Sequence, residues 1–188
     1  MKEKNIQLLH KIIADKSKEW NFEIMKPEHS GTVISILQED WHLFIKMHSP
    51  IVYSLPLQMS ICVEGKAVRA LIFPSPIIIN SGNVSQFVRL SNVANHQYLC
   101  RGNALGRFWA DEESCDLAYE LILDEYLIEH YTEDIGRQLF DIPFNFFKDA
   151  HIPLVELAGN IWKADTAISY LEELWGNGYV DNSDYNLW

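Results

Sequence analysis

Residues 57–73 read LQMSICVEGKAVRALIF, and this stretch decides the fold. Large apolar side chains fall at every second position of its first half: Leu57, Met59, Ile61 and Val63. This period of two is typical of a β-strand with one buried face. The next three residues, Glu64-Gly65-Lys66, predict a tight turn, and the alternation then resumes on a returning strand that carries Ala67, Arg69, Leu71 and Phe73. The stretch therefore predicts an antiparallel hairpin.

Further alternating runs extend this hairpin into a sheet. Residues 33–37 and 41–47 alternate in the same way, and the polar run Gln38-Glu39-Asp40 between them predicts a hairpin connection. The four strands together predict an antiparallel meander. Residues 104–110 and 116–123 are also strand-like, and the acidic stretch 111–114 between them predicts the turn of a second strand pair.

Helical spacing appears in four other places. An amphipathic helix is predicted from Asn5 to Trp20. Ser81 or Asn83 is expected to cap a second helix, which carries Val84, Phe87, Val88, Ala94 and Tyr98. The sequence therefore predicts an α+β fold in which a curved antiparallel sheet, a meander plus a C-terminal strand pair, packs with helices.

The remaining two helices lie in the C-terminal half. Thr132 is predicted to cap a helix through Phe146 that Pro143 kinks or restarts and that 151–153 (His-Ile-Pro) ends. Asp165 is predicted to cap a last helix that Gly176 stops. We expect residues 1–188 to form a single domain, with 160–188 as a C-terminal helix and tail extension.

Composition limits the class of protein. Hydrophobic residues make up 48% of the chain and aromatic residues 12%, as in a packed globular protein. The longest apolar run, 67–79, is shorter than the roughly 20 residues that span a bilayer, and lysines interrupt the N-terminal stretch where a signal peptide needs an apolar core. Three cysteines without CxxC spacing suggest reduced thiols. We therefore expect a cytoplasmic protein without membrane association.

Charge divides the chain unevenly. Residues 1–100 hold 10 Lys/Arg and 8 Asp/Glu, whereas 101–188 hold 5 and 18, for net charges of +2 and −13. Such an acidic half repels phosphate backbones, so we expect no nucleic-acid partner. It would attract a basic protein, although an acidic surface that only favours solubility accounts for the same composition.

Candidate reactive residues do not assemble into a recognisable site. His42 and His48 share one strand face but are separated by roughly 20 Å, too far for one metal ion. His130 lies among acidic residues without a second histidine at helical spacing, and the adjacent carboxylates of the chain point apart. Cys62, Cys100 and Cys115 lack a neighbouring base, and Cys62 is expected to be a core thiol. We therefore expect no catalytic residue, metal or cofactor.

Aromatic residues near the C-terminus have two interpretations. Four of them lie among polar residues: Trp175, Tyr179, Tyr185 and Trp188. They either pack back onto the sheet or line a surface that binds a partner, since large aromatic side chains anchor many protein interfaces.

From Leu90 onward the chain resembles the YbjN-like family of bacterial sensory transduction regulators. The similarity lies in the helical run Leu90-Ser91-Asn92-Val93-Ala94-Asn95, in Gly106-Arg107-Phe108 opening a strand, in the alternation from Leu117 to Leu123, and in the closing amphipathic helix. It covers residues 21–159 in element order, its residue-level similarity is limited to fold-determining positions in 90–158, and the tail after Gly159 departs from it. The resemblance implies a fold similar to that of type III secretion chaperones and a non-enzymatic surface that binds proteins, often as a homodimer.

Three functional hypotheses follow. The first is a non-catalytic protein-binding module, chaperone-like or adaptor-like, that holds a partner segment on a sheet face or in a dimer groove. The alternative is an acidic immunity or antitoxin protein that neutralises a basic toxin. A third is an enzyme whose site is built from residues distant in sequence.

Overall fold

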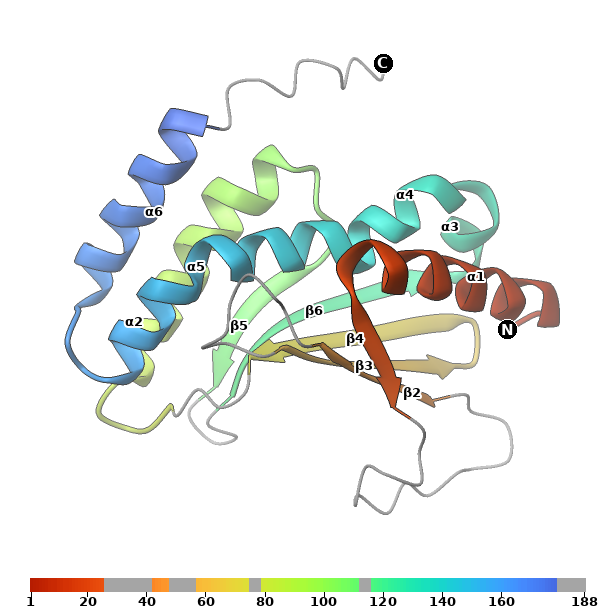
Figure 1. The fold of residues 1–188 in the computed structure, drawn as a ribbon, viewed down its shortest axis with the longest axis horizontal. Helices are drawn as coiled ribbons and strands as arrows, with labels where there is room; N and C mark the ends of the chain where they lie inside the picture. Colours follow the sequence, from red (N-terminus) through yellow and green to blue (C-terminus); the bar gives the residue numbers. More distant parts are fainter. Residues whose placement is uncertain (26–41, 48–56, 75–78, 112–115, 179–188) are drawn as a thin grey trace.

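An antiparallel sheet of six strands forms one layer of the protein (Figure 1). The structure is a computed structural model that describes residues 1–25, 42–47, 57–74, 79–111 and 116–178. Along the chain its strands are β1 (Phe22–Met25), β2 (His42–Met47), β3 (Leu57–Glu64), β4 (Ala67–Pro74), β5 (Arg107–Asp111) and β6 (Asp116–Asp124). Their order in the sheet is β1-β2-β3-β4-β6-β5. The predicted α+β fold, a meander plus a C-terminal strand pair, is confirmed.

The hairpin of β3 and β4 differs from the prediction in its register. Glu64 pairs with Ala67, so only Gly65 and Lys66 form the turn, and Gly65 takes the positive φ of 60° that such a turn needs. A shift of one residue in pairing moves every side chain to the opposite face. Val68, Ala70 and Ile72 therefore face the core opposite Val63, Ile61 and Met59, and the predicted set Ala67, Arg69, Leu71 and Phe73 lies on the other face.

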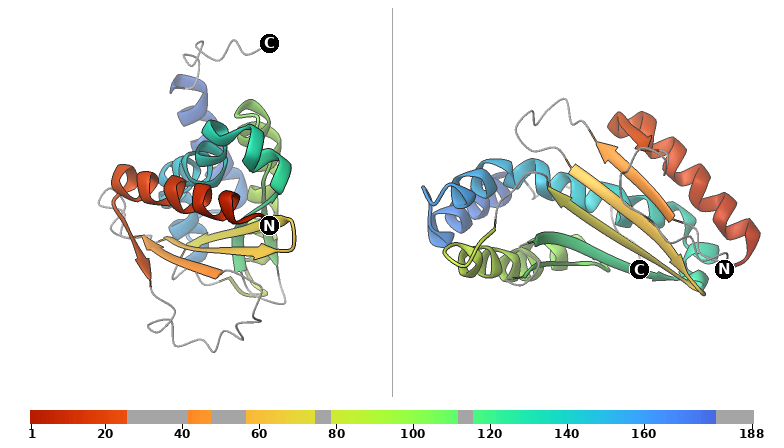
Figure 2. Two further views of the ribbon diagram at one scale, coloured as in Figure 1. Left: turned by 90° about the vertical axis from the view of Figure 1, so that its right-hand side faces the viewer. Right: turned by 90° about the horizontal axis from the view of Figure 1, so that it is seen from below.

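The helices form the second layer. They are α1 (Glu3–Trp20), α2 (Val84–Val93), η2 (Ala94–Leu99), α3 (Glu125–His130), α4 (Thr132–Gly136), η3 (Arg137–Asp141), α5 (Ile142–Ala158) and α6 (Ala164–Gly178), where η denotes a π-helical segment. Viewed from below, the strands lie in front of α1 and α5, so these two helices share one side of the sheet (Figure 2).

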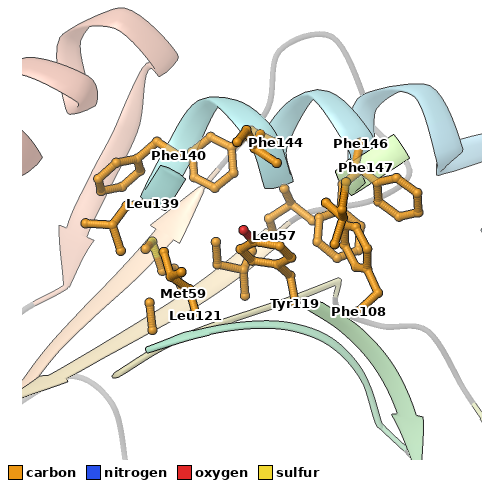
Figure 3. Close-up of a cluster of buried hydrophobic side chains, with 14 of the residues drawn as sticks. Leu57, Met59, Phe108, Tyr119, Leu121, Leu139, Phe140, Phe144, Phe146 and Phe147 are labelled. Carbon is orange, nitrogen blue, oxygen red and sulfur yellow. The ribbon is translucent and has the colours of Figure 1, made fainter. Parts of the chain in front are cut away.

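Phenylalanines of η3 and α5 fill the space between the two layers (Figure 3). Phe140, Phe144, Phe146 and Phe147 are almost completely buried. The ring of Phe108 on β5 lies 3.9 Å from that of Phe146 and 5.0 Å from that of Tyr119, between centroids. Contacts of this kind stabilise aromatic pairs beyond the burial of their area. This cluster holds α5 against the inner face of β3, β4 and β6.

Two expectations for the C-terminal helices are wrong. The segment 151–153 does not end α5, because Pro153 is buried within it and packing onto the core outweighs the helix-breaking tendency of proline. Thr132 does not cap a helix either, since its hydroxyl donates to the carbonyl of Ile128. Pro143 restarts the helix as predicted, because it occupies the first turn of α5 directly after η3.

Other differences concern the ends of the sheet and of α6. Strand β1 is not among the predicted strands. The predicted strand at 33–37 lies outside the described residues, as does most of the predicted turn at 111–114. Gly176 does not stop α6, which continues to Gly178. Residues 160–178 do contain the predicted extra helix.

Asn95 closes the outer edge of β5. Its side-chain amide donates to the carbonyl of Phe108 at 2.8 Å and accepts from the N–H of the same residue at 2.7 Å. These are the peptide groups that β5 would otherwise offer to another strand. The junction of α2 and η2 thus blocks strand pairing at this edge.

Candidate functional site

The face of the sheet opposite α1 and α5 combines charged and apolar side chains. Strand alternation and register place seven of them together, and we call this set the open face: Arg69, Leu71, Phe73, Arg107, Trp109, Glu120 and Ile122. Among the described helices, α1 and α5 lie behind the sheet and the α2–η2 unit lies along its β5 edge. The described helices therefore leave this face uncovered.

A cluster of two arginines and one glutamate lies at the centre of the open face. Nε and Nη2 of Arg69 donate to Oε1 of Glu120 at 2.9 and 2.7 Å. The same two atoms of Arg107 donate to Oε2 at 3.2 and 2.8 Å. Glu120 is only 8% exposed, whereas Arg69 is 44% and Arg107 71% exposed. The carboxylate is thus enclosed by two guanidinium groups that still reach solvent.

This arrangement keeps Glu120 ionised. The hydrogen bonds from Arg107 lower the pKa of its carboxyl group, burial acts in the opposite direction, and the hydrogen bonds and charge of Arg69 add to the lowering. Two cations around one anion leave the cluster with a net charge of about +1 at neutral pH. A local positive charge therefore lies on a chain whose formal net charge is −11.

Apolar side chains adjoin the cluster on the same face. Ile122 pairs across the strands with Arg69 and is 58% exposed. Leu71 pairs with Glu120 in the same way, and Trp109 lies two residues beyond Arg107. Leu71 and Trp109 are half-buried, so together with the exposed Ile122 they give this face apolar surface beside the cluster, and grouped apolar side chains of this kind can mark interaction sites.

The predicted partner-binding aromatic residues are only partly described. Trp175 on α6 is 3% exposed, its ring lies 5.2 Å from that of Tyr98, and its Nε1 donates to Asp149 at 3.3 Å. Trp175 is thus buried against η2 and α5, helices of the second layer, and does not lie on an exposed surface. Tyr179, Tyr185 and Trp188 lie outside the described residues.

The other candidate residues lie apart from one another. His130 ends α3 and stacks on Tyr126 with the ring centroids 4.1 Å apart, and Cys100 is exposed. Cys62 is half-buried on the face turned away from α5, so the expectation of a core thiol is wrong. His48 and Cys115 are not among the described residues. Within the described ranges no three His, Cys, Asp or Glu side chains gather as metal ligands.

A hollow of about 460 Å³ lies between the N-terminal residues, Lys66 and α3. Its acidic side chains are already engaged: Glu129 with Lys2 and Lys4, and Glu125 with the Lys2 N–H and the Asn5 amide. These contacts fasten the start of the chain to α3. Glu125 and Glu129 in this hollow therefore serve to hold the N-terminal residues, and we do not assign a ligand to it.

Basic residues of the N-terminal half form ion pairs with acidic residues of the C-terminal half. Five ion pairs between described residues join the N-terminal hundred residues to the acidic half: Lys2–Glu129, Lys4–Glu129, Lys16–Asp141, Arg69–Glu120 and Arg89–Asp165. Part of the acidic excess therefore binds the two halves of the chain to each other.

Comparison with protein-family models, curated proteins and solved structures finds no match for this chain. None of the helices in the described parts of the chain has the length and apolar content needed to cross a membrane. The geometry of the open face is therefore the main basis for a functional proposal.

The Arg69–Glu120–Arg107 cluster is not predicted by the sequence. Arg69 is the single charge of β4, and Glu120 is a charge in the middle of β6 with apolar residues on both sides, which is the signal that could have drawn attention to them. What brings them together is the pairing of β4 with β6, two strands separated by α2, η2 and β5. That pairing is not fixed by local periodicity.

Proposed function

We propose that this chain is a non-catalytic protein-binding module, chaperone-like or adaptor-like, that holds a segment of another protein on the open face. The observation that carries this proposal is the apolar surface of Ile122, Leu71 and Trp109 beside the charged cluster, on a face that the described helices leave uncovered. Covering such a surface contributes about 25 cal/mol per Å² of apolar area. Binding would thus combine apolar burial with charged contacts that set orientation.

The resemblance to the YbjN-like family supports the same proposal, because it implies a protein-binding surface on a similar fold. Under this proposal the module works in the cytoplasm, where Cys62 and Cys100 stay reduced. The alternative role of neutralising a basic toxin rests on the acidic half, and the ion pairs within the molecule account for part of that charge.

A photo-crosslinking experiment tests the proposal. A photoreactive amino acid replaces Leu71 on the open face and, in a control protein, Ile161, which is 72% exposed outside the sheet. After irradiation in cells, we expect a discrete crosslinked protein from position 71 that position 161 does not give. Adding Ile122→Asp to the protein labelled at 71 should abolish this product. Identical patterns from both positions, or a product that survives Ile122→Asp, contradict the proposal.

A further inference from the structure

Both arginines of the cluster keep unused hydrogen-bond donors. Arg69 and Arg107 each bind Glu120 through Nε and Nη2, and no interaction of either Nη1 is found among the described residues. A guanidinium group carries five N–H donors, so the edge formed by Nη1 and Nη2 is left to bind a second carboxylate. Each arginine thus uses two of its five N–H donors on Glu120.

The cluster is also held in position before any partner arrives. Glu120 is anchored in β6, an interior strand next to the edge strand β5, with its side chain 8% exposed, and it fixes the Nε side of each arginine. Arginines that are already oriented lose less conformational entropy on binding than free surface side chains do. The excess positive charge of the cluster favours an anion, and Asp111 and Asp124 lie on the same face at the ends of β5 and β6.

We propose that the Arg69–Glu120–Arg107 cluster binds the carboxylate of an Asp or Glu in an extended segment of the partner protein, with apolar side chains of that segment on Ile122 and Leu71. This inference rests on the proposed function and specifies the chemistry of the partner. Side chains on one face of an extended segment repeat every two residues, about 6.6–6.8 Å apart. The motif is therefore an acidic residue with apolar residues two positions before or after it.

The surroundings favour a peptide over a free anion or a second copy of this chain. Ile122 lies directly across from Arg69, so an ion without an apolar portion would leave that side chain in water. Two copies that met through their open faces would bring two positive clusters together, which is unfavourable. An acidic segment with apolar neighbours satisfies both parts of the surface.

Selection from a displayed library of random seven-residue peptides tests this inference on the full chain. We expect enrichment of Asp or Glu with apolar residues at the second position to either side. The selected peptides should bind Arg107→Gln at least about tenfold more weakly, the loss expected for one charged hydrogen-bonding pair. Arg107→Gln leaves Arg69 to neutralise Glu120. Arg89→Gln is the matched control, because Arg89 is an exposed arginine on α2, and it should leave binding unchanged.

A second variant distinguishes loss of the charged cluster from misfolding of Arg107→Gln. Replacing Arg69, Glu120 and Arg107 together by Gln removes the charges without leaving a buried carboxylate unpaired, and it should select apolar peptides without the acidic residue. Apolar enrichment without acid on the unmodified protein overturns this inference and leaves the proposed function standing. Enrichment of basic peptides, or of none, overturns the inference too, and the crosslinking at position 71 then decides the proposed function separately.

Discussion

Gly106 lies just before β5, and the ring of Tyr119 packs directly against its backbone. A Cβ atom there would lie 2.3 Å from Cζ and Oη of Tyr119 and 2.8 Å from the Glu120 carbonyl oxygen. Tyr119 is completely buried, and burial raises the pKa of its hydroxyl group. The ring therefore has no room to move aside, and the site requires glycine.

The substitution Gly106→Ala should consequently destabilise the protein by about 1–3 kcal/mol, the usual cost of overpacking a core. Urea unfolding followed by circular dichroism measures this change. Gly176→Ala is the control, because nothing lies within 4 Å of its missing Cβ and it sits inside α6. There the free energy of unfolding should rise by up to about 1 kcal/mol. A neutral Gly106→Ala would mean that Tyr119 yields more readily than its burial indicates.

At the scale of elements, the C-terminal half of α1 is joined to η3 through the carboxylate of Asp141. Nζ of Lys16 lies 2.6 Å from both Asp141 oxygens, and Nε1 of Trp20 donates to Oδ1 of the same residue at 2.8 Å. Burial acts against the charged form of Lys16, but the hydrogen bonds and charges of Asp141 and Glu19 raise its pKa overall. Of the two carboxylates that bind Lys16, only Asp141 lies outside α1, so Asp141 is the one that holds α1 against η3.

We expect Asp141→Asn to lower the free energy of unfolding by about 1–3 kcal/mol, between the values for exposed and fully buried ion pairs. The partner of Lys16 on its own helix provides the control: Glu19 is 57% exposed, so Glu19→Gln should cost less than about 0.5 kcal/mol. Hydrogen exchange of the α1 amides should accelerate only in the first variant. Equal losses of stability in Asp141→Asn and Glu19→Gln would contradict the role of Asp141 in holding α1.

Asp149 gives the packing of α6 on α5 a dependence on pH. Burial raises the pKa of its carboxyl group, while the hydrogen bond from Trp175 and the charges of Lys148 and His151 oppose the rise. Because the folded-state pKa lies above the unfolded value of about 3.9, the protonated acid is favoured in the folded state, and stability is lost as pH rises through the folded pKa.

Asp149→Asn should therefore stabilise the protein at pH 7 and have little effect at pH 3, where the wild-type carboxyl group is protonated. The asparagine still offers an oxygen to Nε1 of Trp175. Unfolding curves of both proteins at the two pH values, monitored by tryptophan fluorescence, measure the difference. A stabilisation of the same size at pH 3 would show that ionisation of Asp149 is not its source.

Elements whose pattern is local were predictable from the sequence, and those that depend on distant contacts were not. The alternation in β3, the spacing in α1 and the restart at Pro143 each follow from neighbouring residues. The faces of β4 depended on whether the turn has two residues or three, a choice that the sequence of the turn alone left open. The cluster around Glu120 required the β4–β6 pairing, which joins residues 51 positions apart.

For the whole molecule, carboxylates that hold the two halves together should make stability fall in acid. Hydrogen bonds from Arg107 are the main cause of the lowered pKa of Glu120. The backbone N–H of Lys2 has the same effect on Glu125. The hydrogen bond from Lys4 contributes most to lowering the pKa of Glu129, which falls to about 2. Each folded value lies below the unfolded value of about 4.3, so the stabilisation is present above that pH and disappears as pH falls through the folded values.

The free energy of unfolding should accordingly decrease between pH 5 and pH 2, while Asp149 acts in the opposite direction. Chemical unfolding at several pH values measures it, and the slope should be shallower in Lys2→Gln/Lys4→Gln, where Glu129 has lost both ion pairs. Lys11→Gln is the control, because Lys11 has an exposed side chain and no ion pair within the described residues. A slope equal in all three proteins would contradict the prediction.

The late position of α5 in the chain affects how the protein is made. The ribosome completes the last of strands β1 to β4 at Pro74. The phenylalanines that cover the inner face of the sheet lie at residues 140–147 and are therefore added later. Translation at about 5–20 residues per second leaves that apolar surface without its cover for roughly 3–15 seconds. Nascent chains of this protein are therefore expected clients of ribosome-associated holding factors, and a stop codon ahead of α5 would release an insoluble fragment.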